Sequence, residues 1–99
     1  MNLNTICALE NAGVAPVNGT AFRGYGTRYT MQTIGTFTAT IQLQGSVNQV
    51  NWRVLDTLYG PDGSIAAGEF YPWLRVAQTS WTSGEMTCCY VIQEAPRTY

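Results

Sequence analysis

The feature that most constrains the fold is an alternation of apolar and polar side chains over residues 36–45, which have the sequence TFTATIQLQG. The apolar positions are Phe37, Ala39, Ile41 and Leu43, and threonine or glutamine stands between them. Successive side chains of a β-strand point to opposite faces of its sheet. The pattern therefore predicts a strand with one face on a core and the other toward water or a partner.

The residues after this strand suggest an antiparallel hairpin. Residues 45–51 are expected to form a turn, and residues 52–59 to return as the partner strand with Trp52 in the core. In that strand Trp52 and Val54 would share one face, but Leu55 and Leu58 break the period of two. A β-bulge adds one residue to one strand of a pair and would restore the alternation, so we predict a bulge near Val54 and Leu55.

Proline and glycine mark the next boundaries. Residues 60–64, GPDGS, predict a turn, because proline presets one backbone dihedral and glycine tolerates a positive one. Pro72 predicts the start of a further strand, since proline cannot donate a hydrogen bond to a sheet ladder. In that strand Leu74 and Val76 would share the inner face.

The last third of the chain suggests one connection and one strand. Residues 79–84, TSWTSG, are rich in residues that favour turns, so we expect a connection there. Residues 85–93 are expected to form the final strand. Its shared face would comprise Met86, Cys88, Tyr90 and Ile92.

Together these elements predict an all-β chain, a single antiparallel β-sandwich of jelly-roll-like layout. Residues 36–93 would form the sandwich core. Residues 1–35 are expected to be a less regular N-terminal segment, with short strands near 12–17 and 29–34, and residues 94–99 a short C-terminal tail. A chain of 99 residues supports one domain, because half of it could not bury a core of its own.

Composition argues against several function classes. The chain has no histidine or lysine, and five arginines against six carboxylates give a net charge of -1, so the basic surface of a nucleic-acid-binding protein is missing. No segment approaches the roughly 20 apolar residues of a membrane span, and the N-terminus lacks the pattern of a signal peptide. We expect no nucleic-acid or membrane partner, synthesis in a cytoplasm, and little charge repulsion between copies.

The three cysteines are Cys7, Cys88 and Cys89. They lack CxxC spacing and a histidine, so we expect no metal site and no cofactor. We expect all three to be reduced packing residues, with a bond from Cys7 to one of the other two as the alternative. Without histidine, acid–base catalysis would depend on carboxylates in turns and at strand ends, so we expect no catalytic residue and no enzyme.

Aromatic residues form 12% of the chain, more than a core of this size can hold. The candidate interface residues are Tyr25, Tyr29, Tyr71, Trp73, Arg75 and Trp81. Arg75 and Trp73 would share an exposed sheet face, where the guanidinium could stack on an indole or bind a carboxylate of a partner. Tyr71, Trp73 and Trp81 are expected near one end, as interface anchors or as a sugar-stacking platform.

Three segments carry a family resemblance: FTATIQLQGS, the tryptophan in NWRVLDT, and YPWLRVAQTSWTSGEMTCCYVI. Over roughly residues 10–93 the chain resembles a small β-sandwich that recurs in tailed bacteriophage virions, and its layout is also similar to the jelly-roll of discoidin and carbohydrate-binding modules. Two departures are the turn VNQVN in place of Asn-Asp-Gly and the apolar MTCCYVI strand. The matching positions are Gly45, Ser46, Trp52, Leu55, Leu74, Arg75, Thr79, Ser80, Thr82, Ser83 and Gly84.

The resemblance implies a non-enzymatic virion structural protein, foremost a capsid decoration or cement protein that bridges capsomers in many copies. Its partners would be the major capsid protein or other virion proteins, and further copies of itself as dimers or trimers. The alternative is a carbohydrate- or receptor-binding or structural module of a phage tail, neck or head fibre. A host protein that merely shares the jelly-roll is a third reading.

Overall fold

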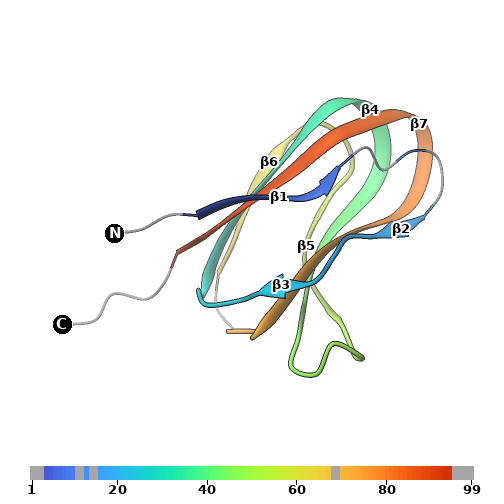
Figure 1. The fold of residues 1–99 in the computed structure, drawn as a ribbon. Helices are drawn as coiled ribbons and strands as arrows, with labels where there is room; N and C mark the ends of the chain where they lie inside the picture. The colour runs from blue at the N-terminus through green and yellow to red at the C-terminus, as the bar shows by residue number, and fades with distance from the viewer. Residues whose placement is uncertain (1–3, 11–12, 14–15, 68–69, 95–99) are drawn as a thin grey trace.

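The structure is a computed structural model and describes residues 4–10, 13, 16–67 and 70–94. Its described part is all-β, with seven strands joined in one antiparallel sheet (Figure 1). This confirms the predicted fold class. The strands are β1 (Asn4–Glu10), β2 (Val17–Asn18), β3 (Phe22–Arg23), β4 (Arg28–Ser46), β5 (Arg53–Leu58), β6 (Gly63–Ala67) and β7 (Trp73–Glu94).

Two long strands organise the sheet. β4 has 19 residues and β7 has 22, and they pair antiparallel along nearly their whole length. Both strands bend together, so the sheet folds back on itself as two layers (Figure 1). The first layer contains β1, β6 and residues 28–35 and 86–94; the second contains β2, β3, β5 and residues 36–46 and 73–85.

The bend between the layers is made by glycines and β-bulges. Gly35 and Gly84 have φ angles of 135° and 74°, which residues with a side chain rarely adopt. The β4–β7 register shifts three times, and each shift leaves one unpaired residue on β7, namely Thr79, Thr82 and Thr87. A bulge bends its strand and increases the local twist, so these threonines help β7 turn the corner.

The predicted connection at residues 79–84 is therefore wrong, because β7 continues through it. Its threonines and serines belong to a bulged strand, and this composition resembles that of a turn. The bulge at Thr87 also changes the phase of the strand, so the face predicted for the last strand is wrong as well. Beyond Thr87 the inward side chains are those of Cys89, Val91 and Gln93, while Tyr90 is exposed.

One apolar core lies between the two layers. The alternating residues of 36–45 are buried in it together with Leu74 and Val76, as predicted. The predicted bulge is also confirmed, because the β4–β5 register skips Leu55. The buried cluster comprises Ala8, Leu9, Tyr29, Met31, Phe37, Ala39, Ile41, Leu43, Leu58, Leu74, Val76, Met86, Cys89 and Val91.

The N-terminal part is more regular than the sequence predicted. β1 was not expected, because a bulge at Ala8 lets both Ala8 and Leu9 face the core and hides the alternation. The segments 29–34 and 36–45, predicted as separate strands, are one strand. Of the strand predicted at residues 12–17, half lies outside the described residues, and Val17 belongs to β2. The tail beyond Glu94 also lies outside the described residues.

Candidate interaction surfaces

The outer side of the second layer carries two stacks of arginine on tryptophan. The Arg75 guanidinium carbon lies 4.2 Å from the centre of the Trp52 ring, and that of Arg23 lies 4.9 Å from the centre of the Trp73 ring. Both distances fall within the roughly 6 Å range of cation–π attraction. We call these four residues the Trp–Arg face.

Strand register brings the Trp–Arg face together. Arg23 lies opposite Trp73 in the β3–β7 pairing, and directly opposed residues of antiparallel strands share a face. Trp73 and Arg75 are two residues apart on β7 and so point to the same side. Trp52 immediately precedes β5, from where its ring reaches Arg75.

Arg75 is also fixed by hydrogen bonds along β4. Its Nε donates to Gln44 Oε1 at 2.7 Å, and Gln44 Nε2 donates to Gln42 Oε1 at 3.0 Å. Burial lowers the pKa of Arg75, but arginine remains charged at neutral pH. Within the described part of the chain, neither Arg75 nor Arg23 forms an ion pair, so indole rings and an amide are the groups that hold these two charges.

A loop that contains two exposed valines adjoins the Trp–Arg face. Residues 47–51 join β4 to β5 and project from one end of the molecule (Figure 1). Val47 and Val50 are 70% and 76% exposed. Four backbone N–H groups of the loop donate to side-chain oxygens of Ser46 and Asn48 at 2.9 to 3.1 Å. These local hydrogen bonds replace a sheet ladder and order residues 48–51, which include Val50.

Trp73 and Arg75 lie on the same face, as the alternation predicted, but their stacking partners were not foreseen. Arg75 stacks on Trp52, which is half-buried at the surface rather than in the core. The prediction for Trp52 is wrong because this residue lies before β5 begins, where strand alternation does not apply. The turn predicted at residues 45–51 is the sequence feature that could have placed Trp52 in the connection before β5.

Two other predicted interface residues are not part of the Trp–Arg stacks. Tyr29 is only 2% exposed, so its predicted exposure is wrong. Its side chain points to the core-facing side of the continuous strand β4. Its hydroxyl donates to the Gly26 carbonyl at 2.8 Å, and burial raises its pKa. Tyr25 is exposed, in a segment held by Gln93, whose Oε1 accepts from the Tyr25 backbone N–H at 2.8 Å.

The predicted cluster of Tyr71, Trp73 and Trp81 is not present as such. The Tyr71 ring covers Gly45, where an added Cβ would come within 2.6 Å of the ring. Trp81 lies near the bend between the layers, where its indole Nε1 donates to the Gly84 carbonyl at 2.6 Å. Since β7 is one long strand, Trp81 is far along it from Trp73.

The cysteines follow the alternative considered from the sequence. Cys7 and Cys88 form a disulfide that joins β1 to β7, so the prediction that all three are reduced is wrong for this pair. Only the long-range β1–β7 pairing brings them together, and spacing along the sequence does not reveal it. Cys89 is free and buried, and burial raises its pKa to about 12.

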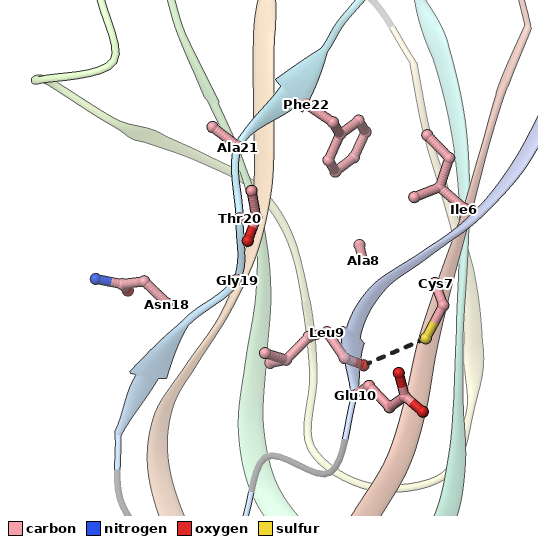
Figure 2. Close-up of a pocket in the computed structure, with 10 residues that line it drawn as sticks. All are labelled: Ile6, Cys7, Ala8, Leu9, Glu10, Asn18, Gly19, Thr20, Ala21 and Phe22. Carbon is pink, nitrogen blue, oxygen red and sulfur yellow. Dashed lines mark hydrogen bonds between the residues drawn. The ribbon is translucent and has the colours of Figure 1, made fainter.

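A cleft of about 490 Å³ opens between β1 and residues 18–22 (Figure 2). The side chains of Ile6, Leu9 and Phe22 point into it, whereas that of Glu10 points away (Figure 2). The lining of the cleft is mixed, because Glu10, Asn18 and Thr20 also border it, and Figure 2 shows no point where these polar side chains converge as they would to orient a substrate.

The described residues include few groups that could bind a metal ion or act as an acid or base. They contain no group of three or more histidine, cysteine, aspartate or glutamate residues that could hold a metal ion, and no helix long and apolar enough to span a membrane. One carboxylate oxygen, Asp56 Oδ2, is buried beside the β5 bulge without a hydrogen-bond partner in this part of the chain. A single carboxylate does not make an acid–base pair.

No protein-family model matches the chain, and no curated protein sequence matches it. Among solved structures, a crystal structure of PirA is similar, with 14% sequence identity, coverage of 93% of both chains and a TM-score of 0.48. The structure itself describes the chain as a small antiparallel all-β domain with the Trp–Arg face on one side.

Proposed function

We propose that this protein is a non-enzymatic structural protein of a tailed bacteriophage virion, of the capsid decoration or cement type. It would bind a neighbouring virion protein through the Trp–Arg face. The observation that carries the binding role is the pair of stacked guanidinium groups, since no described carboxylate pairs with Arg23 or Arg75. The virion setting rests on the sequence resemblance.

The chemistry of the Trp–Arg face fits an acidic protein surface. A guanidinium carries its N–H donors in a planar fork that matches a carboxylate. Stacking on an indole holds that plane in place, so less side-chain freedom is lost on binding. Tryptophan and arginine are also the residue types that most often dominate binding energy at interfaces.

The neighbouring loop adds an apolar element to this surface. Val47 and Val50 are exposed on the loop that leads to Trp52, and we expect them to insert into an apolar depression of the partner. The expected partner surface therefore combines carboxylates with a nearby apolar pocket. Repetition over a lattice would add avidity to each such contact.

The disulfide also supports a protein that functions outside a cell. Disulfides are rare where thiols are kept reduced, as in a cytoplasm, and persist in oxidising surroundings. The Cys7–Cys88 bond would form or be retained on a particle released from its host.

A carbohydrate-binding role at a tail or fibre is the second candidate, because Trp52 and Trp73 are partly exposed. A stacked arginine already covers one face of each ring. Trp81 lies elsewhere, so the three tryptophans do not form a row of open rings for a sugar chain. These features favour a protein partner.

The test is binding of the purified protein to virions assembled without it. An Arg23→Ala/Arg75→Ala variant should bind at least about 100-fold more weakly, since loss of each hot-spot residue costs about 2 kcal/mol. Arg28→Ala removes an equal charge from the first layer and should leave binding unchanged. Equal binding by the double variant and the wild type would exclude the Trp–Arg face as the docking surface.

The virion role itself is tested on the same particles. Virions with the protein bound should resist heating better than bare ones, and the copy number should match the repeat of the shell. No binding to the particle, together with glycan binding that Trp73→Ala abolishes, would instead support the carbohydrate role.

A further inference from the structure

The centre of the outer side of the first layer is an uncharged surface, bordered by Arg28 and Glu94 at one end and by Glu10 at the other. Strand register sets its side chains in rows: Ile92 lies opposite Thr30, and Thr30 lies opposite Ile65 across β6. In the next row Cys7, Tyr90 and Gln32 lie side by side, and then Cys88 faces Ile34. We call this set the apolar face: Cys7, Thr30, Gln32, Ile34, Ile65, Cys88, Tyr90 and Ile92.

The apolar face is more exposed than a folded monomer requires. Ile65 is 57% exposed, Ile34 is 44% exposed and Tyr90 is 37% exposed. None of the residues of the apolar face carries a charge. Contiguous exposed apolar surface on a small domain commonly marks a binding site.

The apolar face is also rigid. It is built on β4 and β7, which are paired on both sides, and the Cys7–Cys88 disulfide fastens the edge strand β1 to it. A surface that is already ordered loses little conformational freedom on association. The face is therefore preorganised for a partner of matching shape.

We propose that the apolar face is a self-association surface, occupied by the same face of a second copy related by a two-fold axis. A charged partner would bury its charges here without a counter-charge, which is costly. The same face of a second copy brings no charge to the centre of the contact, and β-sheets pack on one another face to face. The net charge of -1 leaves little repulsion between copies.

The size of the apolar face predicts weak association. Four strands about 4.8 Å apart and about six residues long give a face of about 400 Å² per copy. Two such faces bury less than the roughly 1,200 Å² of a standard stable interface, so we expect a dissociation constant between about 10 µM and about 1 mM. Dimers would then form mainly where copies are concentrated.

Sedimentation equilibrium from about 1 µM to about 1 mM tests the dimer. Ile34→Lys and Tyr90→Lys, made separately, place like charges near each other across the two-fold axis and should each weaken dimerisation at least about tenfold. Thr38→Lys adds the same charge to an exposed position of β4 in the second layer and should have no effect. A wild-type protein that stays monomeric at about 1 mM, or lysine variants that dimerise as it does, would overturn the proposal.

A second measurement does not depend on destabilising variants. A photo-crosslinking amino acid at Gln32 should cross-link to residues of the apolar face of another copy, while the same probe at Thr38 should give no such product. Cross-links from Gln32 to another surface would overturn the proposal. Neither experiment uses virions, so its failure leaves docking through the Trp–Arg face untouched.

Discussion

At the scale of single residues, Arg75 shows which features the local sequence can predict and which it cannot. Its position between Leu74 and Val76 correctly predicts an outward side chain on the same face as Trp73. Its stacking partner Trp52 could not be predicted, because the loop of residues 47–51 sets where that ring lies. Register within a strand is local information, whereas contact across a loop is not.

Replacing Arg75 by lysine separates charge from shape. Lysine keeps the charge but cannot stack a planar group on Trp52 while donating to Gln44. We expect binding to virions to weaken by about tenfold, a loss of about 1.4 kcal/mol. The free energy of unfolding, measured in urea, should change by less than about 1 kcal/mol because the site is half-exposed. Undiminished binding would show that charge alone suffices.

The thiol of Cys89 should be inert in the folded protein. Burial raises its pKa to about 12, so almost no reactive thiolate is present near neutral pH. Iodoacetamide should modify no thiol in the native protein, one thiol after unfolding without reductant, and three after reduction. Rapid modification of the native protein would contradict the burial of Cys89, and three thiols without reductant would contradict the disulfide.

At the scale of elements, the sequence predicts strands whose alternation is unbroken. Residues 36–43 are such a segment, and even the bulge at Leu55 is visible as a break in the pattern. β1 and the middle of β7 were missed because their bulges place neighbouring residues on one side or leave threonines unpaired. A bulge is defined by its partner strand, which a local pattern does not contain.

Gly84 is expected to be essential to the bend between the layers. Its φ is 74°, and an added Cβ would collide with the Thr36 carbonyl oxygen. Gly84→Ala should lower the free energy of unfolding by about 1 to 3 kcal/mol. The matched control is Gly63→Ala, where the nearest atom is 3.7 Å away and φ is ordinary, and the change should stay below about 1 kcal/mol. Equal effects of the two substitutions would argue against a special role of Gly84.

The disulfide should stabilise β1 more than any other strand. It closes a loop of 81 residues, and in the described part of the chain β1 lies at an edge of the sheet, paired with β7. Reduction should lower the free energy of unfolding by about 2 to 4 kcal/mol. Hydrogen exchange should quicken first in β1, with β5 as an internal control on the opposite edge. Uniform loss of protection over all strands would contradict this local role.

At the scale of the whole molecule, the two layers divide the surface by character. The second layer turns arginine and tryptophan outward, and the first turns isoleucine, threonine and tyrosine outward. One copy could therefore hold a charged partner on one side and a second copy on the other. This division follows from the fold, because a single pair of long strands supplies the outer faces of both layers.

The folded molecule should lose stability in alkali through groups buried in its core. Burial raises the pKa of Cys89 from 9.0 to about 12 and raises the pKa of Tyr29 above 10.0, so the folded state holds both protons more tightly than the unfolded chain. The Cys89 contribution is complete below pH 9.0 and is lost as the pH rises toward about 12, at up to about 1.4 kcal/mol per pH unit.

Urea denaturation between about pH 8 and about pH 11 measures this loss, with Cys89→Ala as the control that lacks the thiol. The wild type should weaken from about pH 9, while the variant, less stable at the outset, should weaken only when Tyr29 begins to ionise in the unfolded chain, near its ordinary pKa of 10.0. Parallel curves for the two proteins would mean that the Cys89 thiol ionises as freely in the folded core as in the unfolded chain.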